Sequence, residues 1–246
     1  MPEKLRLDQL LVDRGLVESR TKAQALIMAG LVYAGEQKLT SAGAKLNVET
    51  ALTLRGQDHP WVSRGGLKLD HGLKHFGFDV KGCTAVDVGA STGGFTDVLL
   101  TYGASKVFAV DVGYGQLAHK LRTDPRVVVL ERTNARALDR AVVPDPVGAV
   151  VCDASFIGLR TVLPAALALT SKDAWLIALI KPQFEVDKDR VGKKGVVRDP
   201  ALHEEVCATI SGWLAEQPGW TVAGVEKSPI TGPEGNVEFL IGARRS

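Results

Sequence analysis

The chain has 246 residues, 45% of which are hydrophobic, and its formal net charge at pH 7 is only +2. This hydrophobic content supports a packed core and excludes an intrinsically disordered protein, while the longest apolar runs are far too short to cross a bilayer. The charged N-terminal segment has no apolar signal sequence. We therefore expect a soluble, cytoplasmic, monomeric protein of one or two domains. Its charge neither requires nor excludes a nucleic-acid partner.

Three cysteines occur in the chain, and none of them belongs to a CxxC pair. Cys83, Cys152 and Cys207 are far apart in sequence, whereas disulfide frameworks and zinc sites use characteristic cysteine spacings. The sequence therefore predicts neither a disulfide nor a bound metal, and it fits a reducing compartment.

The first quarter of the chain predicts a small α+β unit. Apolar residues at helical spacing indicate one helix before Gly15 and a second between Ser19 and Gly30, with Ser19 placed as the N-cap. Short strands are expected at 32–34 and 52–54. Because acidic residues are almost as numerous as basic ones here, charge alone favours a solvated helical surface.

The order of these elements changes that interpretation. The stretch RLDQLLVDRGLVESRTKAQALIMAGLVYAGE, residues 6–36, resembles the S4 RNA-binding domain. The resemblance implies that Arg6, Arg20 and Lys22 face structured RNA and contact phosphates, which position a protein without reading base sequence.

Breaker residues mark the end of this unit. Gly56 and Pro60 interrupt regular structure, and the large side chain of Trp61 is expected to anchor between the two domains. We assign residues 1–58 to an S4-like domain, 59–64 to a linker and 65–246 to a second domain.

The second domain predicts alternating strands and helices. TAVDVGASTGGFTDVLL, residues 84–100, indicates a buried strand, a glycine-rich turn and a helix. A helix with a kink at Pro164 and a helix capped by Asp199 follow later. The last two strands are joined by a turn at 232–235. Strands are expected at 84–88, 106–110, 126–130, 147–152, 175–180, 221–225 and 237–241. This order predicts an α/β fold, a doubly wound seven-stranded sheet whose last strand is antiparallel.

Polar residues at the strand ends indicate an adenosine-type cofactor. The turn reads GASTGG rather than GxGxxG, so the dinucleotide fingerprint is absent. Asp111 ends the second strand, where an acid suits bonding to ribose hydroxyls, and Asn134 is placed to read an adenine edge. NAD stays possible from these features, although no hydride-transfer constellation follows, and S-adenosylmethionine fits well. The competing interpretation is that Asp111 and Asn134 only cap the elements that follow.

Several motifs together resemble one family. VDVGASTGGFTDVLL, CDASFI, LIKPQFEV and GNVEF are similar to motifs of the TlyA family of ribosomal RNA 2′-O-methyltransferases, also called hemolysin A-like, whose catalytic domain is FtsJ/RrmJ-like. The resemblance implies a Rossmann-like class I methyltransferase domain, S-adenosyl-L-methionine as cofactor and ribosomal RNA within ribosomal subunits as partner. It places a catalytic tetrad on Lys68, Asp153, Lys181 and Glu238. It places cofactor contacts on Asp87, Gly89, Ala90, Ser91, Thr92, Gly93, Gly94, Phe95, Asp111, Asn134 and Asp153.

Methyl transfer to a ribose hydroxyl needs alignment and removal of a proton. Lys181 is the best candidate, since Pro182 restricts its backbone to the extended region. Lys181 either removes the proton, which requires a neutral amine, or stabilises the developing alkoxide. For Lys68 the competing interpretation is an ordinary exposed helix lysine, and for Glu238 an exposed strand carboxylate.

Further residues are candidates for RNA contact. Arg64 precedes Lys68, and Phe156 follows Asp153, where it would stack on a flipped base or pack in the core. The loop 186–199, VDKDRVGKKGVVRD, is either a mobile basic clamp with Lys193 and Lys194 at its centre or a solvated surface loop.

Three functions are open at this point. The leading one is 2′-O-methylation of cytidine, in 23S rRNA of the large subunit because the chain ends soon after its last expected strand, with 16S rRNA as a second target. The alternative is a non-catalytic RNA-binding assembly factor that retains the cofactor fold. Membrane lysis, suggested by the hemolysin name, has no amphipathic basic helix or spanning segment to support it.

Overall fold

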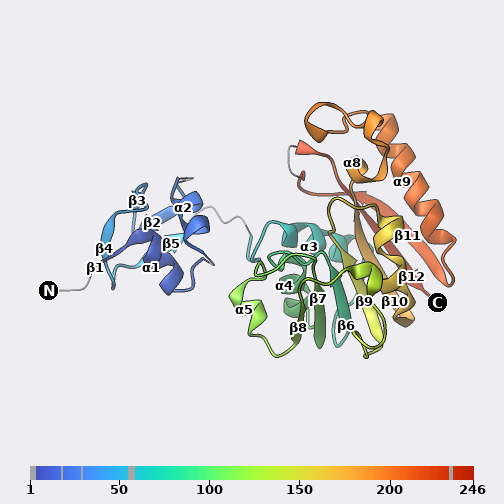
Figure 1. Cartoon of the computed structure of the whole chain (residues 1–246), viewed down its shortest axis with the longest axis horizontal. Helices are drawn as coiled ribbons and strands as arrows, with labels where there is room; N and C mark the ends of the chain where they lie inside the picture. The colour runs from blue at the N-terminus through green and yellow to red at the C-terminus, as the bar shows by residue number, and fades with distance from the viewer. Residues whose placement is uncertain (1–3, 18, 29, 55–58, 233–234) are drawn as a thin grey trace. The chain divides into compact units, whose positions relative to one another are not determined.

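The computed structural model describes the chain except for residues 1–3, 18, 29, 55–58 and 233–234 (Figure 1). It divides into two compact units, Met1–Pro60 and Trp61–Ser246. Part of the expected S4-like domain, at 55–58, and the middle of the expected turn 232–235 lie outside the described residues. No helix among the residues described has the length and apolar character needed to cross a membrane.

The first unit is α+β. Its antiparallel pairs join β1 to β4, and β2 to both β3 and β5. A small core of leucine, isoleucine and valine side chains lies under the two helices, with Leu7, Leu11 and Ile27 fully buried. The helices and two of the strands match the expectation, whereas β1, β3 and β4 were not expected. The elements are β1 (Lys4–Arg6), α1 (Leu7–Asp13), α2 (Arg20–Met28), β2 (Val32–Ala34), β3 (Gln37–Leu39), β4 (Lys45–Asn47) and β5 (Leu52–Leu54).

The second unit contains a seven-stranded sheet in the order β11-β12-β10-β9-β6-β7-β8. The pairs between β10, β9, β6, β7 and β8 are parallel, and β12 is antiparallel to both β10 and β11. This confirms the predicted α/β class and the antiparallel last strand. The strands are β6 (Thr84–Val88), β7 (Lys106–Val110), β8 (Val127–Leu130), β9 (Val147–Cys152), β10 (Thr170–Ile180), β11 (Trp220–Lys227) and β12 (Phe239–Arg245).

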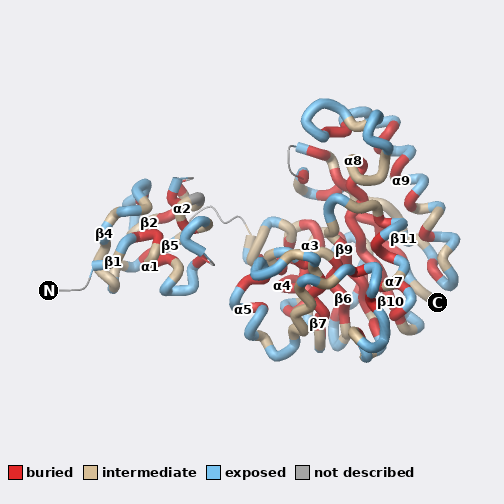
Figure 2. The backbone as a smooth tube through the Cα atoms, in the orientation of Figure 1, coloured by how far each residue is buried: buried red, intermediate tan, exposed pale blue. Residues whose placement is uncertain are grey.

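Helices cover both faces of this sheet, and buried backbone runs through its centre (Figure 2). Alternate residues of the strands point to opposite faces, so that Val86 packs in one cluster and Ala85 in the other. The predicted kink is present, because the helix breaks at Leu163 and restarts with Pro164. The helices are α3 (Gly65–Phe76), α4 (Gly94–Thr101), α5 (His119–Arg122), α6 (Leu159–Val162), α7 (Pro164–Ala168), α8 (Pro182–Glu185) and α9 (Pro200–Ala215), with short 3₁₀ turns η1 (Ala135–Ala137), η2 (Lys188–Arg190) and η3 (Lys193–Gly195).

Some expected strand bounds were wrong. β10 begins at Thr170 rather than at residue 175, because its first turn-like residues, Lys172 and Asp173, are exposed polar positions of the strand. The last strand runs over Phe239–Arg245 rather than 237–241, because its terminal arginines, which look like a solvated tail, bond to the carbonyl oxygens of Gly77 and Thr170. Trp61, which was expected to anchor between the two domains, has its side chain buried in the core of the second unit.

Candidate active site

The glycine turn after β6 is shaped by close backbone approach. Gly89 and Gly93 have φ of 82° and 94°, which favour glycine. A Cβ at Gly89 would lie 2.8 Å from the backbone nitrogen of Ala154, and one at Gly94 would lie 2.9 Å from the nitrogen of Gly66. The turn therefore touches both the loop after β9 and the start of α3, and this contact brings the residues after those points into one site.

Asp111, at the end of β7, is held by two backbone amides. Ser91 N donates to its Oδ2 over 2.8 Å, and Gly113 N donates to its Oδ1 over 2.7 Å. Asp111 therefore holds the glycine turn through Ser91 and the loop after β7 through Gly113, and it does not act as a helix cap. A small pocket opens at this edge of the sheet, lined by Ala90, Ser91, Ala109, Asp111, Gly113, Gln116, Leu117, Val129 and Glu131.

Glu131 is a pocket residue that sequence reasoning missed. It directly follows β8, and it accepts hydrogen bonds from Arg122 and from the backbone nitrogen of Gly115 at 2.5 and 2.9 Å. The rule that singled out Asp111, an acid directly after a strand, would have found it. Asn134, chosen instead, is exposed, caps η1 by accepting from Arg136 N, and does not line this pocket.

Asp87 is a buried acid near the glycine turn. Thr96 donates to its Oδ2 over 2.7 Å, while Oδ1 is buried without a hydrogen-bond partner. The pKa of Asp87 is raised to about 7, chiefly by burial; the negative charges of Asp153 and Asp111 also raise it, and the Thr96 hydrogen bond lowers it. A buried acceptor with a free lone pair fits a cationic amino group, such as that of an amino-acid-derived cofactor.

The four tetrad residues form a chain of alternating charge. Asp153 Oδ1 lies 2.6 Å from Lys181 Nζ and its Oδ2 lies 3.4 Å from Lys68 Nζ, while Lys68 Nζ also lies 2.7 Å from Glu238 Oε2. Lys68, Lys181 and Glu238 are buried. The interpretations of Lys68 as an exposed lysine and of Glu238 as an exposed carboxylate were therefore wrong.

Lys181 is held at the end of β10. Its φ and ψ are −115° and 98°, the extended conformation expected before proline. Besides the Asp153 carboxylate, its Nζ donates to Asp153 O at 3.0 Å and to Ser155 Oγ at 2.9 Å. An ammonium has three N–H donors, and three oxygens surround this one.

Phe156 is the most exposed large apolar side chain among the described residues, at 90%. Its φ is 66°, an uncommon conformation for a bulky residue, and its ring lies 5.1 Å from that of Phe184. Packing in the core is excluded. The strained loop after β9 instead presents an aromatic ring to solvent beside Asp153.

The basic loop after α8 is fastened at two points. Asn236 accepts from Val197 N and donates to Gly195 O, over 3.1 and 3.0 Å. Arg190 binds both carboxylate oxygens of Glu205 on α9. Lys193 and Lys194, between these points, are exposed.

In the first unit, Asp8 forms ion pairs with both of the arginines that were predicted to face RNA. Arg6 and Arg20 each bind its carboxylate at 3.0 Å, and Gln24 does so as well. The Arg6 hydrogen bonds are the largest cause of a strongly lowered pKa of Asp8, and the bonds from Gln24 and Arg20 add to it. Both arginines remain about half exposed. Lys22 is partly buried on α2, and Arg64 is exposed just before α3.

Comparison with known proteins identifies both units. Residues 61–245 match the FtsJ-like methyltransferase family and residues 5–52 match the S4 domain. The 16S/23S rRNA (cytidine-2′-O)-methyltransferase TlyA of Mycobacterium tuberculosis is 48% identical over 245 residues, which are 99% of this chain and 91% of that protein. The chain belongs to the TlyA family of FtsJ-like methyltransferases. It is also 37% identical to the 23S rRNA (cytidine-2′-O)-methyltransferase TlyA of Campylobacter jejuni, over 73% of this chain and 69% of that protein.

A solved structure has the same architecture over the whole chain. A proposed hemolysin from Streptococcus thermophilus is 40% identical, with a TM-score of 0.77 over 100% of this chain and 90% of that one.

Proposed function

We propose that the protein transfers a methyl group from S-adenosyl-L-methionine to the ribose 2′-hydroxyl of cytidine in ribosomal RNA, with 23S rRNA as the first substrate. The observation that carries this proposal is the ion-pair chain Lys181–Asp153–Lys68–Glu238, in which the two lysines and Glu238 are buried, at the edge of the sheet that holds the pocket. The names of the two TlyA relatives support the same reaction.

The site has the groups needed for the cofactor. Asp111, with both oxygens oriented by backbone amides, would accept from ribose hydroxyls, and Glu131 borders the same pocket. The unpartnered Oδ1 of Asp87 would accept from the amino group. The glycine turn 89–95 would lie under the amino-acid end. The cofactor supplies an electrophilic methyl group on a sulfonium.

Lys181 would act on the ribose oxygen. Oxygens already surround its amino group, so one N–H would have to turn from Ser155 Oγ to the ribose oxygen. We assign Lys181 first to holding the hydroxyl in this way and to stabilising the negative charge that develops there, while the hydroxyl proton passes to water. To take the proton itself, Lys181 must first become neutral. Asp153 orients Lys181 and links it to Lys68, and Glu238 supplies the second anion that keeps Lys68 in place.

RNA would be held by exposed groups around this edge. The ring of Phe156 is placed to stack on a base turned out of its helix, and Lys193 and Lys194 to contact phosphates. Arg64 adds a charge at the start of α3. In the S4 domain, Arg6, Arg20 and Lys22 would bind structured RNA through its backbone.

The choice of 23S rRNA rests on what the two relatives share, since both are named for 23S and one also for 16S. The test is methyl transfer from labelled S-adenosyl-L-methionine to purified large and small ribosomal subunits, followed by mapping of 2′-O-methyl positions. We expect incorporation at a cytidine of the large subunit by a monomeric enzyme. Label found on the small subunit alone would refute the 23S assignment.

Lys181→Ala is the control that separates an enzyme from an assembly factor. If methyl transfer is the function, this variant still binds ribosomal subunits but incorporates no label. An RNA-binding assembly factor would give no label with either protein. The completeness of the buried ion-pair chain argues against that alternative, because RNA binding alone does not require two buried lysines.

A further inference from the structure

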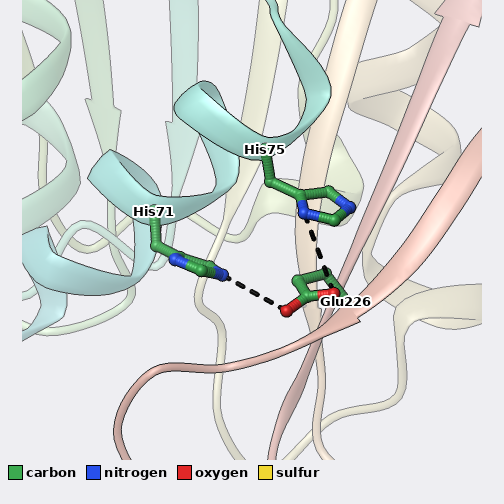
Figure 3. Close-up of side chains that lie close together, drawn as sticks. All are labelled: His71, His75 and Glu226. Atoms are coloured by element: carbon green, nitrogen blue, oxygen red, sulfur yellow. Dashed lines mark hydrogen bonds and ion pairs between the residues drawn. The ribbon is translucent and has the colours of Figure 1, made fainter.

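Two histidines and a glutamate form a cluster away from the tetrad. His71 and His75 lie one turn apart on α3, and Glu226 lies opposite them on β11 (Figure 3). His71 Nε2 is 3.4 Å from Glu226 Oε1, and His75 Nδ1 is 3.8 Å from Glu226 Oε2. Within the described part of the chain, these form the one group of three or more His, Cys, Asp or Glu side chains whose ligand atoms come close together, all within 4.8 Å.

This set of donors is typical of a transition metal. Two imidazoles and one carboxylate bind Zn²⁺ in proteins, with water as a further ligand. Bonds of about 2.0 Å in a tetrahedron require ligand atoms about 3.3 Å apart, so small side-chain rotations would close this cluster on an ion. Each of the three side chains is between one-third and one-half exposed, which leaves room for rotation and for water.

The backbone that carries the cluster is firmly packed. Gly72, beside His71, lies against Ile177 and Leu240, and a Cβ there would be 3.3 Å from Ile177. Phe76, beside His75, covers Gly242, where a Cβ would lie 2.7 Å from its ring. α3 and the sheet are thus held at a fixed spacing while the three ligand side chains stay free to turn.

The neighbouring charges do not oppose a cation. Lys74, between the two histidines in sequence, is paired with Asp70 at 2.8 Å, and Tyr102 also donates to Asp70. The Glu226 carboxylate is the anion that faces both imidazoles. A metal ion would therefore meet one carboxylate and two imidazole nitrogens.

We propose that His71, His75 and Glu226 form a site for a divalent transition-metal ion of the Zn²⁺ type, which joins α3 to the edge strand β11. The sequence predicted no metal site because only cysteine spacing was considered, and the glutamate joins the histidine pair through the fold alone. The site lies on the helix that carries Lys68 but shares no residue with the tetrad. It is therefore independent of the proposed methyl transfer.

The test is titration of the untagged full-length protein with ZnCl₂, followed by calorimetry, with Co²⁺ absorption as a spectroscopic probe of coordination. We expect about one equivalent bound, weakened about 100-fold or more in His71→Ala, His75→Ala and Glu226→Gln, since loss of even a supporting group costs 10- to 100-fold. His119→Ala removes an exposed histidine of α5 outside the cluster and is the matched control.

A second measurement tests the joining of α3 to β11. At a hundredfold excess over the dissociation constant, Zn²⁺ should raise the unfolding temperature by about 5 to 10 °C and slow amide exchange in β11, in the unmodified chain and in His119→Ala but not in Glu226→Gln. Absence of binding, or binding that survives in all three cluster variants, would leave the cluster as an ion pair and overturn the proposal. Circular dichroism of each variant checks that it is folded.

Discussion

Each unit contains an aspartate bound by two basic side chains, and the two units arrange these charges in opposite ways. In the S4 unit the Asp8 carboxylate is fully covered, while Arg6 and Arg20 remain about half exposed. In the methyltransferase unit Lys68 and Lys181 are buried, and the Asp153 carboxylate between them is the more exposed group, at 20%. The same pairing thus leaves the cations exposed in one unit and the anion more exposed in the other.

The difference lies in which charge keeps contact with water. Around Asp8 the guanidinium groups stay hydrated and available to an RNA backbone, and the carboxylate fixes their direction. Around Asp153 the ammonium groups lose water, which strengthens every electrostatic interaction they make. Such buried cations need several anions, and Glu238 supplies the additional one. The two clusters therefore differ in which charge is buried: the anion in the S4 unit and the cations in the methyltransferase unit.

The largest effect should come from Lys181. Replacing it by methionine keeps the apolar part of the side chain but removes Nζ, the atom of Lys181 that would hold the ribose oxygen. We expect methyl transfer to fall by about 10²- to 10⁴-fold, measured with labelled cofactor on large subunits, while cofactor affinity changes little. Lys172→Met, an exposed lysine at the opposite end of the same strand, should retain activity. If Lys181→Met retained most of the activity, Lys181 would have no role in the reaction.

The second largest effect should be a loss of stability in the S4 unit when Asp8 is replaced. Asp8→Ala removes the acceptor shared by Arg6, Arg20 and Gln24, and we expect a loss of about 2 kcal/mol, the usual contribution of hydrogen bonds to charged groups. The loss is moderate because the arginines can return to water. Hydrogen exchange should accelerate in α1 and α2, but not in the second unit.

Asp13→Ala is the matched control for this measurement, since Asp13 lies on the same helix but is exposed. Faster exchange after both substitutions would mean that the helix, rather than the arginine cluster, is the sensitive element.

Asp87 extends the comparison to a buried acid without a cation. Its pKa is raised to about 7 in the folded chain, above the ordinary value for an aspartate, so the folded state retains a proton that the unfolded state has lost. The contribution of Asp87 to stability is therefore full below about pH 4 and is lost as the pH rises toward about 7.

Urea unfolding between about pH 5.5 and 8.5 should show the part of this loss that falls in that range, about 2 kcal/mol. The asparagine of Asp87→Asn cannot ionise, so the free energy of unfolding of this variant should lack this pH dependence. A wild-type chain whose stability changes with pH no more than that of the variant would contradict the raised pKa.

Much of the fold could be predicted because its causes are local. The strands at 84–88, 106–110 and 147–152 coincide with the observed ones, since buried parallel strands are nearly continuous apolar runs. β12 was misplaced because its last residues are arginines that bond to distant carbonyl groups. Glu131 was not considered, although it is an acid directly after the expected strand 126–130, as Asp111 is after the strand before it.

The site was less predictable, because its charges are paired across the fold. No local pattern joins Lys68 on α3 to Glu238 before β12, and each residue alone resembles an exposed surface group. Only the family resemblance placed them together, and the structure then showed both to be buried. The cluster of His71, His75 and Glu226 had no such resemblance to support it. It became visible only when α3 was seen beside β11.

The smallest effect should be on the salt dependence of RNA binding, and it should differ between cations that have no carboxylate partner among the described residues and those already bound to a carboxylate. Lys193 and Lys194 are exposed in the basic loop, whereas Arg6 and Arg20 share the charge of Asp8. Replacing both lysines by alanine should weaken RNA binding and reduce the slope of log affinity against log salt by about 1 to 2, because fewer counterions are released. Arg6→Ala with Arg20→Ala should reduce the slope less.

The matched control is Lys81→Ala with Lys172→Ala, which removes exposed lysines before β6 and at the start of β10. An unchanged salt slope in the loop variant would refute the basic clamp, and equal slopes in the loop and arginine variants would show that Asp8 leaves its arginines fully available to RNA.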